Sequence, residues 1–362
     1  MPTKDSSTWT NDKKALVVSS VSKSINTSKL RSPIAYSYYT PSLVQSKNLI
    51  LYKTIAPILP LNYIKTVLAG AYQNTSPDLD GIGLNARFLN GYQVLYNDIY
   101  VYIVNRGSQT IRRCNIYTGE VTTYAGQYGL GGSTNGTTLL NSTFQNPTSA
   151  TFDSINNILY VATSPSIRQI NLGTNTISTF YTRGSELTEL CSIVYKNGFI
   201  YGADSYKSII FKIEVSTKTF SVVAGTSGAA KGYVDGASAD ARFSFNGFLP
   251  QGLTADNYGN LYLADSGNTR IRKIVISTGE VSTILNTTNG VSVLSYYNDS
   301  VYYIVTIGGF LTMRKINVKS LVDEEVLSKN IGVVNTQSIA IVNEKIIYSF
   351  GSSTTQIVKY SA

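Results

Sequence analysis

Histidine is absent from this 362-residue chain, and its absence narrows the chemistry that the side chains could perform. A serine or cysteine nucleophile usually relies on an imidazole as its general base, and histidine is also the commonest metal ligand. The two cysteines, Cys114 and Cys191, are too few for a disulfide framework, and a metal site would need other ligands. The sequence therefore disfavours both triad hydrolysis and chemistry at a histidine-bound metal.

Carboxylates could still hold a hard cation such as Ca²⁺, which needs several converging oxygen ligands. The strands that we place innermost in the fold below contain "YQVLY", "SATF", "SIVY", "GLTA", "VLSY" and "IAIV", which offer hydroxyl groups but no carboxylates. Asp153 and Asp256 stand at strand ends, where a turn role is favoured, and Glu189 stands alone. We therefore predict no catalytic residue, no metal site and no cofactor.

A series of basic residues is the most regular chemical feature of the chain. Arginine occupies one equivalent strand position in four of six repeats. The next position holds Lys or Arg in five of six repeats. The two sets are Arg112, Arg168, Arg272 and Arg314, and Arg113, Lys212, Lys273, Lys315 and Lys359. They could form a basic ring that faces an anionic partner. Alternatively, their stems pack between repeats and their heads pair with Asp204, Asp265 or turn carbonyls, which we favour because residues 61–362 carry only +3 of the +9 net charge.

These side chains are positioned by a repeated set of strands. The segment "GNLYLADSGNTRIRKIVISTGEVSTI" (259–284) contains three strands, with alternating apolar residues between turns rich in Gly, Ser, Asn and Thr. The same plan recurs from Ile99, Ile158, Phe199, Val301 and Ile346, and a further strand precedes each copy. The chain thus contains six four-stranded units, spaced roughly 40 to 60 residues apart.

Repeated four-stranded antiparallel units are typical of a β-propeller, so the fold class predicted is all-β, with six blades. The last unit ends after its third strand, "IVKYSA" (357–362), whereas "NYIKTVLAG" (62–70) resembles a fourth strand with no blade before it. We predict that Tyr63–Leu68 pairs with Ile357–Tyr360 and closes the ring, which leaves no open sheet edge.

A short peptide precedes three of the units. It reads "DGIGLNARF" (80–88), "NGTTLLNSTF" (135–144) and "DGASADARF" (235–243). We interpret its Asp-Gly as a turn and its Phe (Phe88, Phe144 and Phe243) as a wedge between neighbouring blades. A ligand-binding role is the alternative.

The segment "GNLYLADSGNTRIRKI", with "TGEVSTI" after it and "DGASADARF" before it, resembles the repeat of NHL-type propellers. The resemblance covers residues 61–362 and implies a six-bladed propeller. It also brings two alternatives to a binding function: a hydrolase or lyase of the lactonase type, and an RNA-binding NHL domain. The missing histidines and inner-strand carboxylates count against the enzyme. The lack of aromatic residues interleaved with the basic ones counts against nucleic acid.

Residues 1–60 form a separate region by composition, a basic arm rich in Ser, Thr and Tyr that holds eight basic and two acidic residues. We predict that the arm binds a partner protein, because such a segment buries too little apolar surface to offset its ordering entropy. The arm residues expected to do so are Lys13, Lys14, Lys23, Lys29, Arg31, Tyr36, Tyr38 and Tyr39. On the exposed-ring interpretation, Arg112, Arg168, Arg272 and Arg314 would join them.

The three longest connections between units, Ala71–Arg87, Gln127–Thr143 and Thr226–Arg242, are expected on one face of the disk, where insertions often bind partners. The functional prediction is a non-enzymatic protein-interaction or assembly module, a structural component of a larger particle such as a virion. No signal peptide and no membrane-spanning run is visible, so synthesis inside the cell is expected.

Overall fold

Each repeat folds into an antiparallel β-sheet, as the alternation of apolar and polar residues predicts. The computed structural model describes residues 63–71, 77–164, 166–228, 230–245, 252–291, 293–307, 310–327, 336–344, 346–351 and 356–362. The predicted strands of the segment 259–284 are confirmed: they are β16, β17 and β18. No helix in the described ranges is long and apolar enough to cross a membrane.

We number the sheets by chain order. Sheet 1 contains β2 (Gly81–Ile82), β3 (Gly91–Asn97), β4 (Tyr100–Asn105), β5 (Thr110–Asn115) and β6 (Glu120–Ala125). Sheet 2 contains β7 (Ser149–Asp153), β8 (Ile158–Ala162), β9 (Ser166–Asn171) and β10 (Thr176–Thr182). Sheet 3 contains β11 (Leu190–Lys196), β12 (Phe199–Asp204), β13 (Ile209–Glu214) and β14 (Phe220–Ala224).

The second half of the chain follows the same order. Sheet 4 contains β15 (Leu253–Ala255), β16 (Asn260–Asp265), β17 (Arg270–Val275) and β18 (Val281–Asn286). Sheet 5 contains β19 (Leu294–Tyr297), β20 (Ser300–Ile307), β21 (Phe310–Asn317) and β22 (Asp323–Leu327). Sheet 6 contains β23 (Thr336–Asn343), β24 (Ile346–Gly351), β25 (Gln356–Ser361) and β1 (Ile64–Ala69). Within the described ranges, three short 3₁₀ turns lie outside the strands: η2 (Gly83–Asn85), η3 (Leu139–Asn141) and η4 (Ser266–Asn268).

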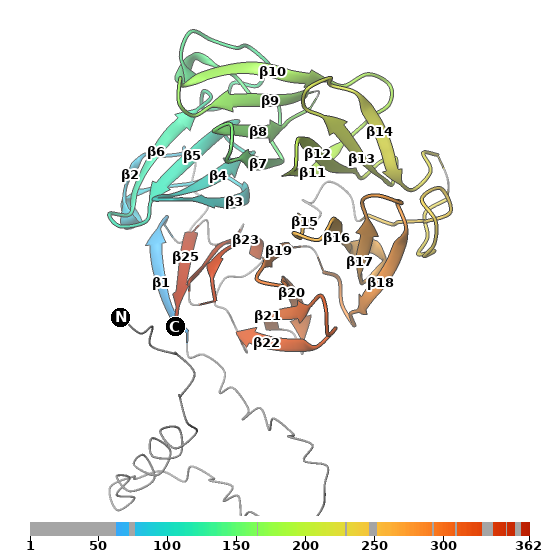
Figure 1. The fold of residues 1–362 in the computed structure, drawn as a ribbon. Coiled ribbons are helices and arrows are strands. Elements are labelled where there is room, and N and C mark those ends of the chain that lie inside the picture. The colour runs from blue at the N-terminus through green and yellow to red at the C-terminus, as the bar shows by residue number, and fades with distance from the viewer. Residues whose placement is uncertain are drawn as a thin grey trace, which may run out of the picture. The chain divides into compact units, whose positions relative to one another are not determined.

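The sheets stand around a central axis, and their innermost strands are β3, β7, β11, β15, β19 and β23 (Figure 1). Neighbouring inner strands contact each other in the order β3, β7, β11, β15, β19, β23 and back to β3. The protein is therefore an all-β propeller with four-stranded antiparallel blades.

Sheet 1 departs from the prediction that every unit has four strands, because it has five. The extra strand, β2, pairs outside β6, with Gly81 opposite Val121 and Ile82 opposite Glu120. The described part of this connection, residues 77–87, runs along the outer strand, where Gly83 N donates to Gly119 O (2.9 Å). The long connections were expected on one face of the disk, and in sheet 1 this is wrong, since the connection covers the outer edge of the blade.

The predicted ring closure is confirmed. Strand β1 pairs with β25 in antiparallel register, from Ile64 opposite Ser361 to Ala69 opposite Ile357. Residues near the start and the end of the described chain thus complete sheet 6, with β23 as its inner strand and β1 as its outer strand.

The core lies between the sheets, because both faces of each blade are covered. One tyrosine at the same position in the second strand of every sheet is buried, with 5% exposure or less. These tyrosines are Tyr102, Tyr160, Tyr201, Tyr262, Tyr302 and Tyr348. Several stack on an aromatic residue of the next inner strand, as Tyr262 does on Tyr296 with ring centroids 6.5 Å apart. Packing between blades thus accounts for this repeated tyrosine of the second strand.

The three phenylalanines of the repeated peptide confirm the predicted wedge. Phe88, Phe144 and Phe243 are at most 1% exposed. Each belongs to an apolar cluster formed by two neighbouring sheets: sheets 6 and 1, sheets 1 and 2, and sheets 3 and 4, respectively.

Candidate functional site

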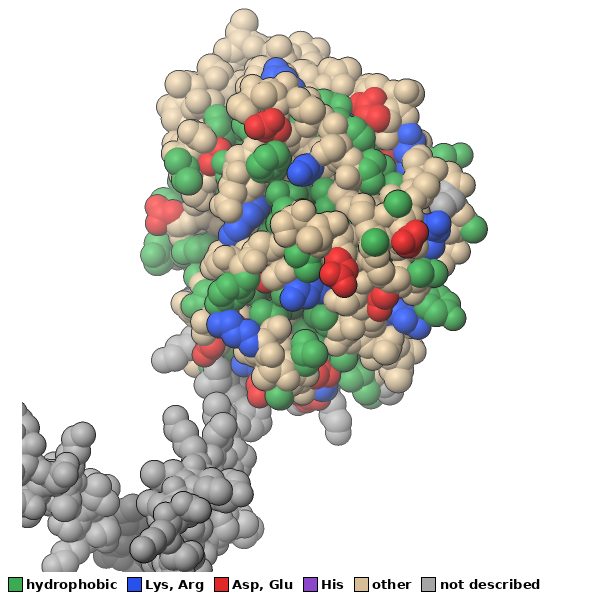
Figure 2. Space-filling view, turned by 45° about the vertical axis from the view of Figure 1, so that its right-hand side comes forward, with side chains coloured by type: hydrophobic (Ala, Val, Ile, Leu, Met, Phe, Trp, Pro, Cys, Tyr) green, Lys and Arg blue, Asp and Glu red, His purple; other side chains and the backbone are tan. Residues whose placement is uncertain are grey.

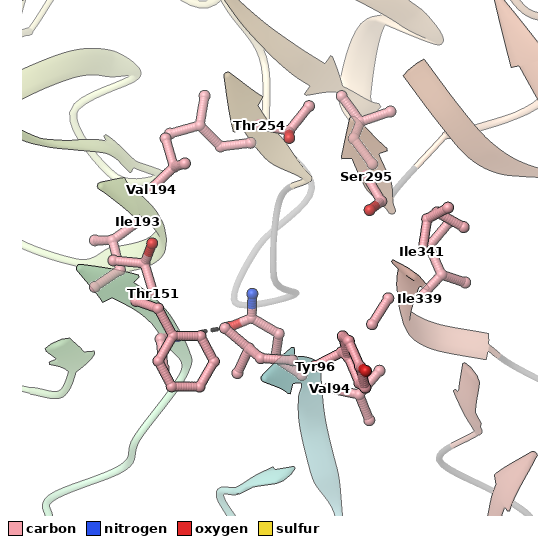
Figure 3. A pocket seen from close by; sticks show the side chains of 16 residues that line it. Val94, Tyr96, Thr151, Ile193, Val194, Thr254, Ser295, Ile339 and Ile341 are labelled. Carbon is pink, nitrogen blue, oxygen red and sulfur yellow. Dashed lines mark hydrogen bonds between the residues drawn. The ribbon is translucent and has the colours of Figure 1, made fainter. Parts of the chain in front are cut away.

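The central channel is lined by the inner strands and forms a cavity of about 250 Å³. Side chains from all of these strands surround it in Figure 3, among them Thr151, Ser295 and Ile339. The lining residues are Gln93, Val94, Leu95, Tyr96, Ala150, Thr151, Phe152, Ile193, Val194, Leu253, Thr254, Leu294, Ser295, Ile339, Ala340 and Ile341. The lining contains aliphatic, aromatic, hydroxyl and amide groups and no charged side chain.

Several polar groups at the channel wall bind backbone groups of the next sheet. Ser149, Thr151 and Thr254 each accept a hydrogen bond from a backbone N–H one sheet further on, those of Ile193 (3.0 Å), Tyr195 (2.8 Å) and Tyr296 (3.1 Å). Gln93 and Ser338 do the same for Ala150 (2.5 Å) and Val94 (3.0 Å). These side chains join adjacent inner strands, so part of their bonding capacity is already used in the wall.

The two aspartates at the ends of the inner strands accept hydrogen bonds from backbone N–H groups. Asp256 is fully buried and accepts the N–H groups of Tyr258 (2.8 Å) and Asn260 (2.9 Å), and Asp153 accepts those of Ile155 and Asn156 (both 3.2 Å). The predicted turn role of both aspartates is confirmed. Burial raises the pKa of Glu189, which accepts a hydrogen bond from Ser205 (3.3 Å). Among the described residues, no group of three His, Cys, Asp or Glu side chains could hold a metal ion.

Arg272 of sheet 4 has a complete set of partners although its side chain is fully buried. Its guanidinium contacts Asp235 (2.6 Å) and Asp265 (2.7 Å). It also donates to the carbonyl oxygens of Val234 (2.8 Å) and Arg242 (3.1 Å). Two carboxylates therefore share one buried cation, and the backbone satisfies its remaining N–H groups.

Arg112 of sheet 1 has a similar arrangement, except that its Nε has no hydrogen-bond partner. It is also fully buried and contacts Asp80 (2.6 Å) and Asp78 (3.1 Å). Asn105 stands at the strand position of Asp265 and donates to Asp78 (2.7 Å). The second carboxylate therefore comes from the connection 71–87 in sheet 1, and from the strand in sheet 4.

The aspartate that begins the repeated peptide joins three elements. Asp235 accepts hydrogen bonds from the backbone N–H (2.9 Å) and the hydroxyl (3.1 Å) of Thr283 in the outer strand, as well as from Arg272. Asp80 binds Thr123 in the same way, at 3.0 and 3.1 Å. The peptide thus attaches the connection to both the third and the fourth strand of the blade it enters, which accounts for the repetition of its aspartate in the sequence.

Arg168 of sheet 2 is buried like the other two but has few partners. Its Nη2 donates to Thr134 O (3.1 Å) and to Asn135 Oδ1 (3.0 Å). Its Nε and Nη1 atoms have no hydrogen-bond partner, and burial lowers its pKa. Asn135 replaces the aspartate of the peptide in this copy.

The remaining sheets differ again. Arg314 of sheet 5 is partly exposed and pairs with Asp323 on the adjacent strand (2.9 Å). Sheet 3 has Phe211 at the arginine position, and sheet 6 has Val358. Asp204, which we expected to pair with a cation, accepts the N–H groups of four residues instead.

A basic ring that faces a partner needs exposed guanidinium groups, and Arg112, Arg168 and Arg272 are 0% exposed. Their positions match the packing interpretation. Sequence reasoning found Asp265 as a partner but missed Asp78, Asp80 and Asp235. The signal was available, because the Asp-Gly form of the peptide occurs where carboxylates pair with the buried arginine. The predicted arm residues Lys13, Lys14, Lys23, Lys29, Arg31, Tyr36, Tyr38 and Tyr39 lie outside the described residues.

The three long connections carry an excess of exposed hydrophobic side chains. They hold eight of the nineteen large hydrophobic residues that are exposed in the described ranges. The connections contain less than a fifth of all described residues, so this share is high. The eight are Leu79, Ile82, Leu84, Tyr128, Leu130, Leu140, Tyr233 and Val234. Charges are mixed on the face shown in Figure 2, where Lys and Arg lie among Asp and Glu.

Comparison with known proteins assigns this chain to no family. No protein-family model matches the chain. A segment of 89 residues is 39% identical to the Protein SUPPRESSOR OF QUENCHING 1, chloroplastic, of Arabidopsis thaliana; it covers 25% of this chain and only 8% of the length of that relative.

Similar solved structures include a chain of a nidogen/laminin complex (15% identity, TM-score 0.49, 64% of this chain and 78% of that one). Another is streptogramin B lyase (12% identity, TM-score 0.49, 74% of this chain and 78% of that one). A third is an auxiliary nutrient binding protein from Bacteroides thetaiotaomicron VPI-5482 (16% identity, TM-score 0.43, 83% of this chain and 77% of that one). Similarity at this level carries no argument, and the propeller assignment rests on the sheet topology.

Proposed function

We propose that this protein is a non-enzymatic protein-interaction module built on a six-bladed propeller of the NHL type. Sheet 1 is counted as a blade in this proposal, because its strands β3 to β6 have the order of the other blades and β2 adds two residues at its outer edge. Contact of β3 with both β7 and β23 supports this count.

The observation that carries the proposed function is the concentration of exposed hydrophobic side chains on the three long connections. Leu84 is 64% exposed and Tyr233 is 60% exposed, although the connections that bear them are fixed to the blades by hydrogen bonds and buried phenylalanines. A partner could bury these side chains without ordering a mobile loop, and the hydrophobic effect would favour that burial. Aromatic and aliphatic side chains among mixed charges fit a protein partner better than a nucleic acid.

The proposal extends to a role in a larger assembly, with the basic arm of residues 1–60 as a second contact and a virion as one such particle. This part rests on composition, since the arm holds +6 of the +9 net charge. Its lysines and arginine would direct the module toward an acidic surface.

The test compares variants of the full-length chain that are altered on the connections with one altered elsewhere. Leu84→Ser, Leu130→Ser and Tyr233→Ser each remove an exposed apolar group from a connection. Ile155→Ser, at a 90% exposed position between β7 and β8, is the matched control. Cross-linking and mass spectrometry with extracts of the source cells would identify the partner of the unaltered chain, and purified partner would then give dissociation constants.

We expect the connection variants to weaken binding at least about tenfold, with melting temperatures unchanged, and the Ile155 variant to bind normally. Equal binding by all four variants would overturn the assignment of this surface. Hydrolysis of lactones or esters by the purified chain, with or without added Ca²⁺, would favour the enzyme instead. RNA affinity that falls steeply with salt would favour an RNA-binding domain.

A further inference from the structure

Arg168 is a buried cation to which the described residues offer no carboxylate. A guanidinium keeps its proton under all ordinary conditions, so burial leaves a full positive charge in the protein interior even though it lowers the pKa. Two of its three nitrogens, Nε and Nη1, have no partner. An unpaired buried charge is costly, and N–H donors without acceptors add to that cost.

Comparison within the chain shows what is missing. Two positions of the connection and one position of the second strand supply the carboxylates in sheets 1 and 4. Sheet 1 has Asp78, Asp80 and Asn105 at these positions; sheet 4 has Tyr233, Asp235 and Asp265; sheet 2 has Ser133, Asn135 and Thr163. Sheets 1 and 4 therefore each provide two negative charges at these positions, and sheet 2 provides none.

Thr163 occupies the position from which Asp265 reaches Arg272. Val161 pairs with Arg168 as Leu263 pairs with Arg272, and Thr163 lies two residues beyond Val161, on the same face of the sheet. Thr163 is 1% exposed, and its hydroxyl donates to Ser166 O (2.7 Å). The side chain is shorter than aspartate and carries no charge, so Nη1 of Arg168 lacks the acceptor that Nη1 of Arg272 has.

We propose that a small monovalent anion of the halide class binds beside Nε and Nη1 of Arg168, in place of the carboxylates of sheets 1 and 4. A water molecule could accept hydrogen bonds there but would not neutralise the charge. The full burial of Arg168 selects a small ion over a phosphate or a metabolite. This site is independent of the proposed protein-binding surface, because its residues are buried.

The test uses the full-length chain and Thr163→Asp, which restores the carboxylate of sheet 4. Thr163→Ser is the matched control, because it keeps a short uncharged hydroxyl side chain. Melting temperatures are measured as sodium bromide replaces sodium gluconate at constant ionic strength. We expect the unaltered chain and the Ser variant to gain about 2–4 °C, and the Asp variant to melt higher in gluconate and to gain nothing from bromide. An equal bromide response of the unaltered chain and the Asp variant would overturn the site.

Crystals grown in bromide give a second readout that does not depend on stability. Anomalous scattering should place a bromide ion within hydrogen-bond distance of Nη1 of Arg168, and the peak should be absent from the Thr163→Asp variant. The reciprocal change must remove both carboxylates: Asp235→Asn combined with Asp265→Thr should create a second bromide peak at Arg272 in sheet 4. A well-ordered Arg168 with no bromide beside it would refute the proposal, whatever the melting temperatures.

Discussion

Sheets 4 and 2 place an arginine at the same strand position and bury it equally, yet sheet 4 surrounds it with carboxylates and sheet 2 with neutral groups. Arg272 meets Asp235 and Asp265, whereas Arg168 meets a carbonyl oxygen and the neutral Asn135. The repeated peptide keeps its phenylalanine buried in both copies. The comparison shows that the shape of the wedge between blades can be preserved while its charge balance is lost.

Sheet 3 offers a third arrangement, without an arginine. Phe211 fills the position and is fully buried, and Gly202 lies opposite it in the adjacent strand. A Cβ atom at position 202 would come within 2.2 Å of the Phe211 ring. An apolar ring needs no countercharge, and the connection that enters this sheet carries no copy of the repeated peptide. The arginine and the acidic peptide thus occur together or not at all in sheets 1, 3 and 4.

The largest effect is expected when the arginine is removed from each sheet in turn. Arg272→Met should lower the free energy of unfolding by about 3–5 kcal/mol, because it leaves buried Asp265 without a cation. Arg168→Met should cost less than about 1 kcal/mol, or even stabilise, in halide-free buffer, since no carboxylate is left unpaired. Urea unfolding of both variants in gluconate measures the difference. Losses of equal size would show that the two arginines have the same environment.

A smaller effect is expected when the acid of the peptide is exchanged between the two copies. Asn135→Asp should stabilise the chain by about 1–2 kcal/mol, because it gives Arg168 a charged partner at a position already in contact with Nη2 (3.0 Å). Asp235→Asn should destabilise by a similar amount, limited by the partial exposure of that side chain. Thermal unfolding of the single and double variants tests both signs. If Asn135→Asp destabilises, the surroundings of Arg168 already supply the missing charge.

The third prediction concerns the sheet that avoids the charge. Gly202→Ala should destabilise the chain by about 1–3 kcal/mol, because the added methyl group overlaps the Phe211 ring. Combining it with Phe211→Leu should recover part of the loss, and a double-mutant cycle by urea unfolding measures the coupling. Additive costs of the two substitutions would mean that Gly202 is required for another reason.

The strands, the repeat and the closure of the ring could all be predicted from the sequence alone. Alternating apolar residues and Gly-, Asn- and Ser-rich turns act over a few residues, so their pattern can be read locally, and the six copies reinforce each other. The unpaired strand at 62–70 and the missing strand after 357–362 together predicted the pairing of β1 with β25.

Which charges contact each other depends on how the blades and connections pack in three dimensions. Asp80 and Arg112 are 32 residues apart in the chain, and Asp235 and Arg272 are 37 apart, so their contacts depend on the path of a long connection. That path, down the outer edge of the blade in sheet 1, is set by hydrogen bonds of Gly81–Gly83 to the outer strand and its turn and by the buried Phe88. Local pattern carries no information on such a path. Strand propensity could therefore place each arginine in its strand, while its partners, or the lack of them at Arg168, followed from the packing of one blade against the next.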